Sequence, residues 1–226
     1  MLVKKTMVIS FLAQIVTLFI GINAQFVMLD PKDVILKQAL ALENLVQFIE
    51  GSFYLWFILF YLNNVDKTDI AKYRYYDWFL TTPTMILSAI VYFQYNNLKH
   101  QDQVQEFTLL EFLKSDKNKV LELFGYNFGM LAIGYLHEIG LIHIALSTFI
   151  GFGFFFMLFI KIYNYYVKQS SANYLIFYLM ASIWSLYGIA AIFKFKLKNA
   201  CYNILDIFSK NFYGLFLAYL VFSLRT

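Results

Sequence analysis

Six ionisable residues lie within long apolar segments of this chain: Glu43, Glu50, Arg74, Asp77, Asp206 and Lys210. A charged side chain at the centre of a bilayer costs about 2.5–3.5 kcal/mol on insertion scales, so such residues are usually functional. Asp206 and Lys210 stand four residues apart, on one face of a helix. Arg74 and Asp77 share a face of a second helix with Thr81. The pattern favours a buried cation held between anions. The alternative is a pair of structural ion pairs, which stabilise helices poorly compared with apolar packing.

The segments that carry these residues are apolar enough to cross a membrane. The 226 residues are 61% hydrophobic and only 14% charged, a composition that ordinary soluble domains do not approach. A helix needs roughly 20 apolar residues to cross a hydrocarbon core of about 30 Å. Seven such spans are predicted, at residues 6–27, 38–62, 74–97, 119–137, 139–162, 170–193 and 199–222. Period-two alternation is absent, which excludes a transmembrane barrel. The predicted fold is an all-α, seven-transmembrane-helix bundle that forms a single domain over residues 1–226.

The first span has the basic start and apolar run of a secretory signal peptide. We predict that it is retained as the first helix, because its cleavage would leave six spans. With the N-terminus outside, nine Lys and Arg residues fall on the inner side and seven on the outer side. This weak positive-inside bias favours an N-terminus outside the membrane.

The charge distribution and the cysteine content exclude several classes of function and structure. The net charge of +4 is spread over the loops without a basic cluster, so nucleic acid is not an expected partner. A single cysteine, Cys201, rules out an internal disulfide, and no metal site is predicted. The lysines at 158–168 and 193–198 are expected to extend from span ends to the membrane interface. Residues 103–114 place Val104, Phe107, Leu110 and Phe112 among polar residues, which predicts an amphipathic helix at the membrane surface.

Two segments that contain the buried charges carry a family resemblance. Residues 74–83 have the sequence RYYDWFLTTP, and residues 205–210 have the sequence LDIFSK. These resemble the third and seventh helices of the microbial (type I) rhodopsins. The resemblance implies that Lys210 binds all-trans retinal as a Schiff base, with Asp77 and Asp206 as counterions and Arg74 beside them. A protonated Schiff base in a dry pocket is a fixed cation, so it needs anions next to it.

The resemblance extends over nearly the whole chain. Trp184 and Tyr187 match the WxxY pattern of the sixth helix, with Gly188 where a proline is common. The retinal-binding residues that it implies are Tyr54, Trp78, Thr81, Thr82, Met85, Asn127, Met130, Gly134, Ser147, Thr148, Trp184 and Tyr187. Trp78 and Trp184 are expected to sandwich the polyene, while Tyr54 and Tyr187 hydrogen-bond Asp206. The match is weaker in the first helix, and Ala191 replaces a frequent aromatic residue.

Two features of a proton pump are missing from the sequence. Counting from Asp77, the third-helix triplet is Asp77, Thr81 and Ser88. Pumps of the family with a carboxylate donor have Asp or Glu at the last position, and a serine cannot replace it as a proton donor. Residues 191–205 also contain no carboxylate, whereas a glutamate pair releases the proton there in the best-known outward pump.

Two other features indicate an ion pathway through the protein. Glu43 and Glu50 are seven residues apart and share one helix face, as the glutamates of channelrhodopsin second helices do. Asn211 resembles the asparagine of the channelrhodopsin central gate, and we expect Glu50 and Asn211 to form a constriction beside the Schiff base. Carboxylates along a water path attract cations and partly dehydrate them. The alternative is that Glu50 is a protonated structural acid. The expected pathway residues are Glu43, Glu50, Ser88 and Asn211.

Together, the third-helix triplet, the short loops and the second-helix glutamates resemble the viral rhodopsins of large algal viruses, in their channelrhodopsin-like group. The resemblance implies a retinal-based photoreceptor that acts as a light-gated cation channel and is not an enzyme. An outward proton pump is the alternative, and a sensory rhodopsin is the third possibility. The expected partners are retinal, the lipid bilayer and the transported cations or protons, with a homo-oligomer possible. The expected location is a multi-pass position in a membrane, that of the host cell if the protein is viral.

Overall fold

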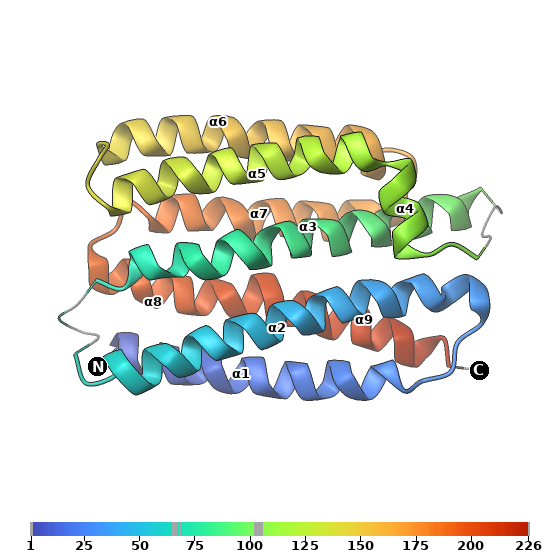
Figure 1. Ribbon diagram of the computed structural model, residues 1–226, viewed down its shortest axis with the longest axis horizontal. Coiled ribbons are helices and arrows are strands. Elements are labelled where there is room, and N and C mark those ends of the chain that lie inside the picture. The colour runs from blue at the N-terminus through green and yellow to red at the C-terminus, as the bar shows by residue number, and fades with distance from the viewer. Residues whose placement is uncertain (1, 65–66, 68, 102–105, 226) are drawn as a thin grey trace.

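A computed structural model describes residues 2–64, 67, 69–101 and 106–225, and these form a bundle of long helices that run along one axis (Figure 1). The first five long helices are α1 (Leu2–Gln25), α2 (Val34–Tyr61), α3 (Ala71–His100), α5 (Lys117–Glu138) and α6 (Ile144–Ile162). The sixth is α7 (Tyr174–Ala190). The seventh consists of α8 (Phe195–Asp206), the π-helical turn η4 (Ile207–Asn211) and α9 (Phe212–Ser223). Each of the seven predicted spans corresponds to one of these helices, so the predicted fold class is confirmed.

The two ends of the bundle carry different connections. One end holds the start of α1, the loop from α2 to α3, and the turns that precede α6 and α8 (Figure 1). We call it the N-terminal end. The opposite, C-terminal end carries the short helices η1 (Pro31–Asp33), α4 (Leu109–Ser115) and η3 (Ser171–Asn173). Thr108 and Glu111 form a capping box at the start of α4, and Phe112 is buried against the core. The amphipathic helix expected at 103–114 is therefore shorter than predicted, and Val104 lies outside the described residues.

Helix boundaries differ from the prediction where local geometry interrupts an apolar run. The sequence predicts a fifth span that begins at residue 139, but α6 begins at Ile144 after a turn. Gly140 occupies this turn with φ at 81°, a left-handed conformation that glycine adopts without a steric penalty. His143 then caps α6 by accepting a hydrogen bond from the Ala145 amide. A second π-helical turn, η2 (Tyr163–Val167), ends this helix.

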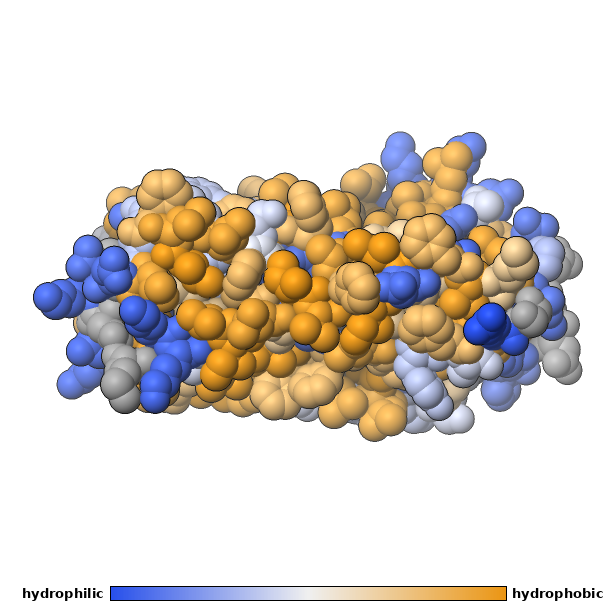
Figure 2. All heavy atoms as spheres, turned by 90° about the horizontal axis from the view of Figure 1, so that it is seen from below, coloured by the Kyte–Doolittle hydropathy of each residue, from blue (hydrophilic) through white to orange (hydrophobic). Residues whose placement is uncertain are grey.

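The outer surface of the bundle suits a lipid environment. Apolar residues cover most of the middle of the face seen in Figure 2, and hydrophilic residues gather at its two ends. Large apolar side chains are exposed on several helices, among them Phe19 at 70%, Phe60 at 70% and Phe149 at 81%. In the described part of the chain, α1, α6 with η2, α7 with η3, and the seventh helix are long and apolar enough to cross a membrane. The other three long helices contribute buried polar side chains to the interior, as Glu50, Asp77 and Asn127 show. The chain is therefore an integral, multi-pass membrane protein.

Candidate functional site

Lys210 lies in the π-helical turn η4, halfway along the seventh helix, and is 2% exposed. Its Nζ atom is 2.8 Å from Glu50 Oε1 and 3.1 Å from Asp77 Oδ2. Asp206 Oδ1 is 3.6 Å from the same Nζ atom. All three carboxylates are buried. The structure thus brings together the expected lysine and both expected carboxylates, and it adds Glu50 as the nearest of the three.

Asp206 is fixed by hydrogen bonds from three other helices. Tyr54 and Tyr187 donate to its carboxylate at 2.6 and 2.8 Å, which confirms both expected contacts. Arg74 donates to Asp206 Oδ2 at 3.2 Å. In contrast, Asp77 Oδ1 is buried without a hydrogen-bond partner among the described residues. Asp206 is therefore the more constrained of the two anions, because Asp77 has one oxygen without a hydrogen bond from the described residues.

The Arg74 guanidinium is enclosed by aromatic rings and amides. Its Cζ atom lies 5.5–5.8 Å from the ring centroids of Tyr54, Phe57 and Tyr202. Arg74 Nη2 also donates to Asn203 Oδ1. These contacts hold the buried cation against Asp206. The sequence prediction missed Tyr202 and Asn203, although Tyr202 lies one turn before Asp206 and two turns before Lys210 on the same helix face.

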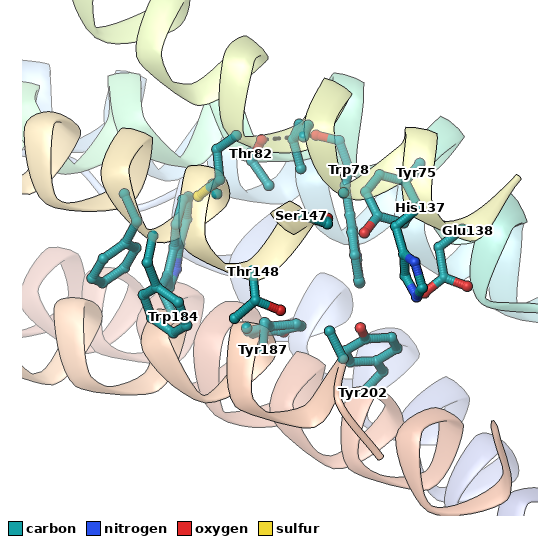
Figure 3. Close-up of a pocket in the computed structure, with 18 of the residues that line it drawn as sticks. Tyr75, Trp78, Thr82, His137, Glu138, Ser147, Thr148, Trp184, Tyr187 and Tyr202 are labelled. Atoms are coloured by element: carbon teal, nitrogen blue, oxygen red, sulfur yellow. Dashed lines mark hydrogen bonds between the residues drawn. The ribbon is translucent and has the colours of Figure 1, made fainter. Parts of the chain in front are cut away.

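A largely apolar cavity leads away from Lys210 between α3, α5, α6 and α7. Its volume is about 130 Å³, and it opens in part to the surface. The predicted residues that line it are Trp78, Thr82, Met85, Met130, Gly134, Ser147, Thr148, Trp184, Tyr187 and Lys210. Figure 3 shows Trp78 and Trp184 on different sides of the view, with Ser147 and Thr148 between them. An aromatic, mostly apolar pocket that ends at one amine fits a long apolar aldehyde such as retinal.

Three predicted pocket residues do not line the cavity. Asn127 donates instead to Thr82 Oγ1 of the cavity wall at 2.8 Å, which links α5 to α3. The Thr81 hydroxyl donates to the Asp77 backbone carbonyl at 3.1 Å. Tyr54 hydrogen-bonds Asp206, so it positions the carboxylate and does not line the cavity.

The cavity also has lining residues that the sequence prediction missed, including Tyr75, His137, Glu138, Phe152, Phe155, Tyr202 and Ser209. Gly188 also lines the cavity, and the sequence marked this position as unusual because a proline is common there in the family. A Cβ atom on Gly188 would lie 2.8 Å from Phe152 Cζ, so the glycine leaves room for that ring in the cavity wall.

A second polar region lies between α1, α2 and the seventh helix. Asn211 Nδ2 is 3.1 Å from Gln14 Oε1, 3.0 Å from Thr17 Oγ1 and 2.9 Å from Gln47 Oε1. All four side chains are buried. The α2 residue that bonds Asn211 is thus Gln47, whereas Glu50, one turn away, bonds Lys210. We call Gln14, Thr17, Gln47, Glu50 and Asn211 the polar seam.

Glu43 and Ser88, the remaining predicted pathway residues, lie further toward the C-terminal end. Both are fully buried. Ser88 lies beside Glu43 and also beside Tyr213 of α9, and its hydroxyl donates to the Ala39 carbonyl at 3.2 Å. The third helix thus has no carboxylate at this depth, but α2 supplies one next to Ser88.

Comparisons with known proteins agree with this arrangement. The family described as bacteriorhodopsin-like protein matches residues 5–224. Among solved structures, the viral rhodopsin OLPVRII is similar over 100% of both chains, with 27% identity and a TM-score of 0.81. A blue light-absorbing proteorhodopsin from Med12 covers 98% of this chain and 96% of its own, with 16% identity and a TM-score of 0.73. Xanthorhodopsin, described as a light-driven ion pump with dual chromophore, covers 98% and 92%, with 17% identity and a TM-score of 0.70. No curated protein sequence matches the chain.

Proposed function

Because the chain belongs to the bacteriorhodopsin-like family of microbial rhodopsins, whose chromophore is retinal, we propose that Lys210 carries retinal as a Schiff base and that the protein is a light-gated cation channel. Light-driven isomerisation is the chemistry that retinal supplies when bound. The residues of the chain do the rest. Asp77 and Asp206 balance the positive charge at Lys210, and the aromatic cavity keeps bulk water away from it.

The observation that supports a channel is the polar seam. Within the described residues, four of its buried atoms have no hydrogen-bond partner: Gln14 Nε2, Gln47 Nε2, Glu50 Oε2 and Asn211 Oδ1. Buried polar groups are normally satisfied by protein or water, so a concentration of such atoms favours a wetted region. Glu50 adds a carboxylate, which attracts cations to such a path. The seam therefore supplies the lining that a cation pathway requires.

The seam is also close enough to Lys210 to respond to it. Asn211 follows Lys210 directly in η4, and Glu50 bonds Lys210 Nζ at 2.8 Å. A displacement of the lysine side chain therefore acts on both walls of the seam, through the backbone of η4 and through the Glu50 ion pair. We propose this coupling as the basis of gating by light.

One observation favours an outward proton pump as the second candidate. Glu43 is a buried carboxylate beside Ser88, at the position where donor carboxylates of the family occur on the third helix. A carboxyl group from α2 is able to fill the donor role that Ser88 cannot. The two candidates therefore differ in whether protons alone move, in one direction, or cations move along their gradient.

Voltage clamp of illuminated cells expressing the protein separates the two candidates. We expect a photocurrent that reverses sign with the sodium gradient at fixed pH. In Glu50→Gln and in Asn211→Leu the conductance or the reversal potential should change, because one variant removes the charge of the seam and the other its amide. The pigment should still form, since Asp77 and Asp206 remain beside Lys210.

Glu106→Gln, which changes an exposed carboxylate at the C-terminal end, is the matched control and should behave as the wild type. An outward current at every voltage that ignores sodium would exclude the channel and support the pump. Wild-type currents in both seam variants would show that the seam does not line the ion pathway.

A further inference from the structure

Lys198, in the first turn of α8, does not extend to the membrane interface as the sequence suggested. It is 6% exposed, and its Nζ atom is 2.8 and 3.0 Å from the two carboxylate oxygens of Glu138, at the end of α5. The same Nζ atom is 3.1 Å from Asp69 Oδ2, in the segment that precedes α3. We call Asp69, Glu138 and Lys198 the Lys198 cluster. It ties together three segments that are far apart in sequence, at the N-terminal end of the bundle.

A row of polar contacts leads from this cluster to the buried lysine of the site. Asn199 Nδ2 donates to Asp69 Oδ1 at 2.9 Å, and Arg74 Nε donates to Asn199 Oδ1 at 3.5 Å. Arg74 in turn bonds Asp206, whose Oδ1 atom is 3.6 Å from Lys210 Nζ. The Asp69 side chain is 39% exposed, so the row begins at the surface. Polar groups therefore connect the aqueous N-terminal end to Lys210 without a gap.

One member of the cluster, Glu138, also lines the retinal cavity. Glu138 and its neighbour His137 line that cavity together with Tyr202. Figure 3 shows His137 and Glu138 beyond Trp78, on the side away from Trp184. Glu138 thus belongs both to the cavity wall and to the ion-paired cluster. Because Lys198 pairs with Glu138 in the cavity wall and with Asp69 at the start of the row, a change at Lys198 would affect both.

We propose that the Lys198 cluster is a gate that controls the access of water and small polar solutes from the N-terminal end to Lys210. One lysine holds two carboxylates close together, and without its charge they would repel each other. Burial alone would raise the pKa of Asp69, but hydrogen bonds from the Ala71 amide and Asn199, with the charge of Lys198, lower it below its usual value. Asp69 is therefore charged at neutral pH and takes part in the ion pairing. The gate rests on retinal attachment at Lys210 but not on the kind of ion transport.

Hydroxylamine tests this gate, because it is a small polar solute that destroys a retinal Schiff base and bleaches the pigment. The purified pigment is held in the dark with hydroxylamine, and the loss of the visible band is timed. Lys198→Met should bleach about tenfold faster than the wild type, since the unpaired carboxylates favour local opening. Lys198→Arg keeps a cation between the carboxylates and should bleach at nearly the wild-type rate. Lys196→Met, at an exposed lysine two residues away, is the matched control and should also match the wild type.

A wild-type bleaching rate in Lys198→Met pigment would overturn the gate. If that variant forms no pigment, Asp69→Asn replaces it, because Asp69 is partly exposed and Glu138 still pairs with the lysine. Asp69→Asn should bleach about threefold faster, and an unchanged rate would overturn the gate. A wild-type protein that forms no visible band with added all-trans retinal would refute the attachment at Lys210 and the gate with it. A pigment that passes no cations would refute only the channel.

Discussion

At the scale of single residues, Lys210 has the most direct test, because a matched substitution preserves its charge. Lys210→Arg keeps a cation among Glu50, Asp77 and Asp206, so the bundle should fold. A guanidinium does not form a retinal Schiff base, so the purified variant should be colourless with added retinal. Its far-ultraviolet circular dichroism should match the wild type. Lys196→Arg is the coloured control. A visible band in Lys210→Arg that borohydride fixes to another lysine would refute the assignment.

The structure also distinguishes the two expected counterions. Asp206 is engaged by Tyr54, Tyr187 and Arg74, while Asp77 Oδ1 has no partner in the described residues. Asp77→Asn removes the less constrained anion, so the visible band should shift to the red and disappear at a lower pH than in the wild type. Spectrophotometric pH titration measures both effects. Unchanged spectra and titration would transfer the main role to Asp206 or Glu50.

At the scale of elements, buried amides hold the C-terminal end together around η2. Asn173 Nδ2 lies 2.9 Å from Asn97 Oδ1, 3.0 Å from the Tyr166 carbonyl and 3.1 Å from the Phe93 carbonyl. Asn173→Ala removes these bonds and leaves Asn97 Oδ1 unpaired, at a cost of ~1–3 kcal/mol. The thermal bleaching midpoint should fall by about 2–12 °C for a chain of this size. Asn118→Ala, at an exposed position of α5, should leave it unchanged. Equal midpoints would show that the amide cluster does not stabilise the bundle.

Elements were easier to predict than contacts between them. The apolar segments between polar breaks predicted all seven long helices, because a membrane requires each backbone group to bond within its own helix. In the described residues, four of these helices are apolar enough to be recognised by hydropathy alone. The sequence predicted a buried Glu50 but not its ion pair with Lys210. A helix advances by about 100° per residue, so a small rotation decides which of several carboxylates is nearest. The sequence also contains no sign that Lys198 is buried, because its partners Asp69 and Glu138 come from distant segments. Neither π-helical turn had a sequence signal.

At the scale of the whole molecule, the direction of insertion is a prediction that cysteine labelling can test. Nine Lys and Arg residues lie toward the C-terminal end and seven toward the N-terminal end, which favours an N-terminal end outside. In a Cys201→Ser background, Asn64→Cys should react with a membrane-impermeant maleimide on intact cells. Asn118→Cys, at the opposite end, should react only after permeabilisation. Both positions are exposed. The reverse labelling pattern would show that the N-terminal end faces the cytoplasm and that the C-terminal end faces the outside.

Asn211 has a further consequence for the proposed pathway. Its side-chain amide carries two hydrogens and faces three acceptor oxygens, on Gln14, Thr17 and Gln47. Only two acceptors can be served at once, so several arrangements contain the same number of bonds. The seam therefore keeps some configurational entropy after folding, because its hydrogen bonds can be arranged in more than one way. Because the Asn211 amide can change its hydrogen-bond acceptors at little cost in free energy, the seam can adjust to a passing ion without binding it tightly. Such a compliant lining suits rapid permeation better than tight binding.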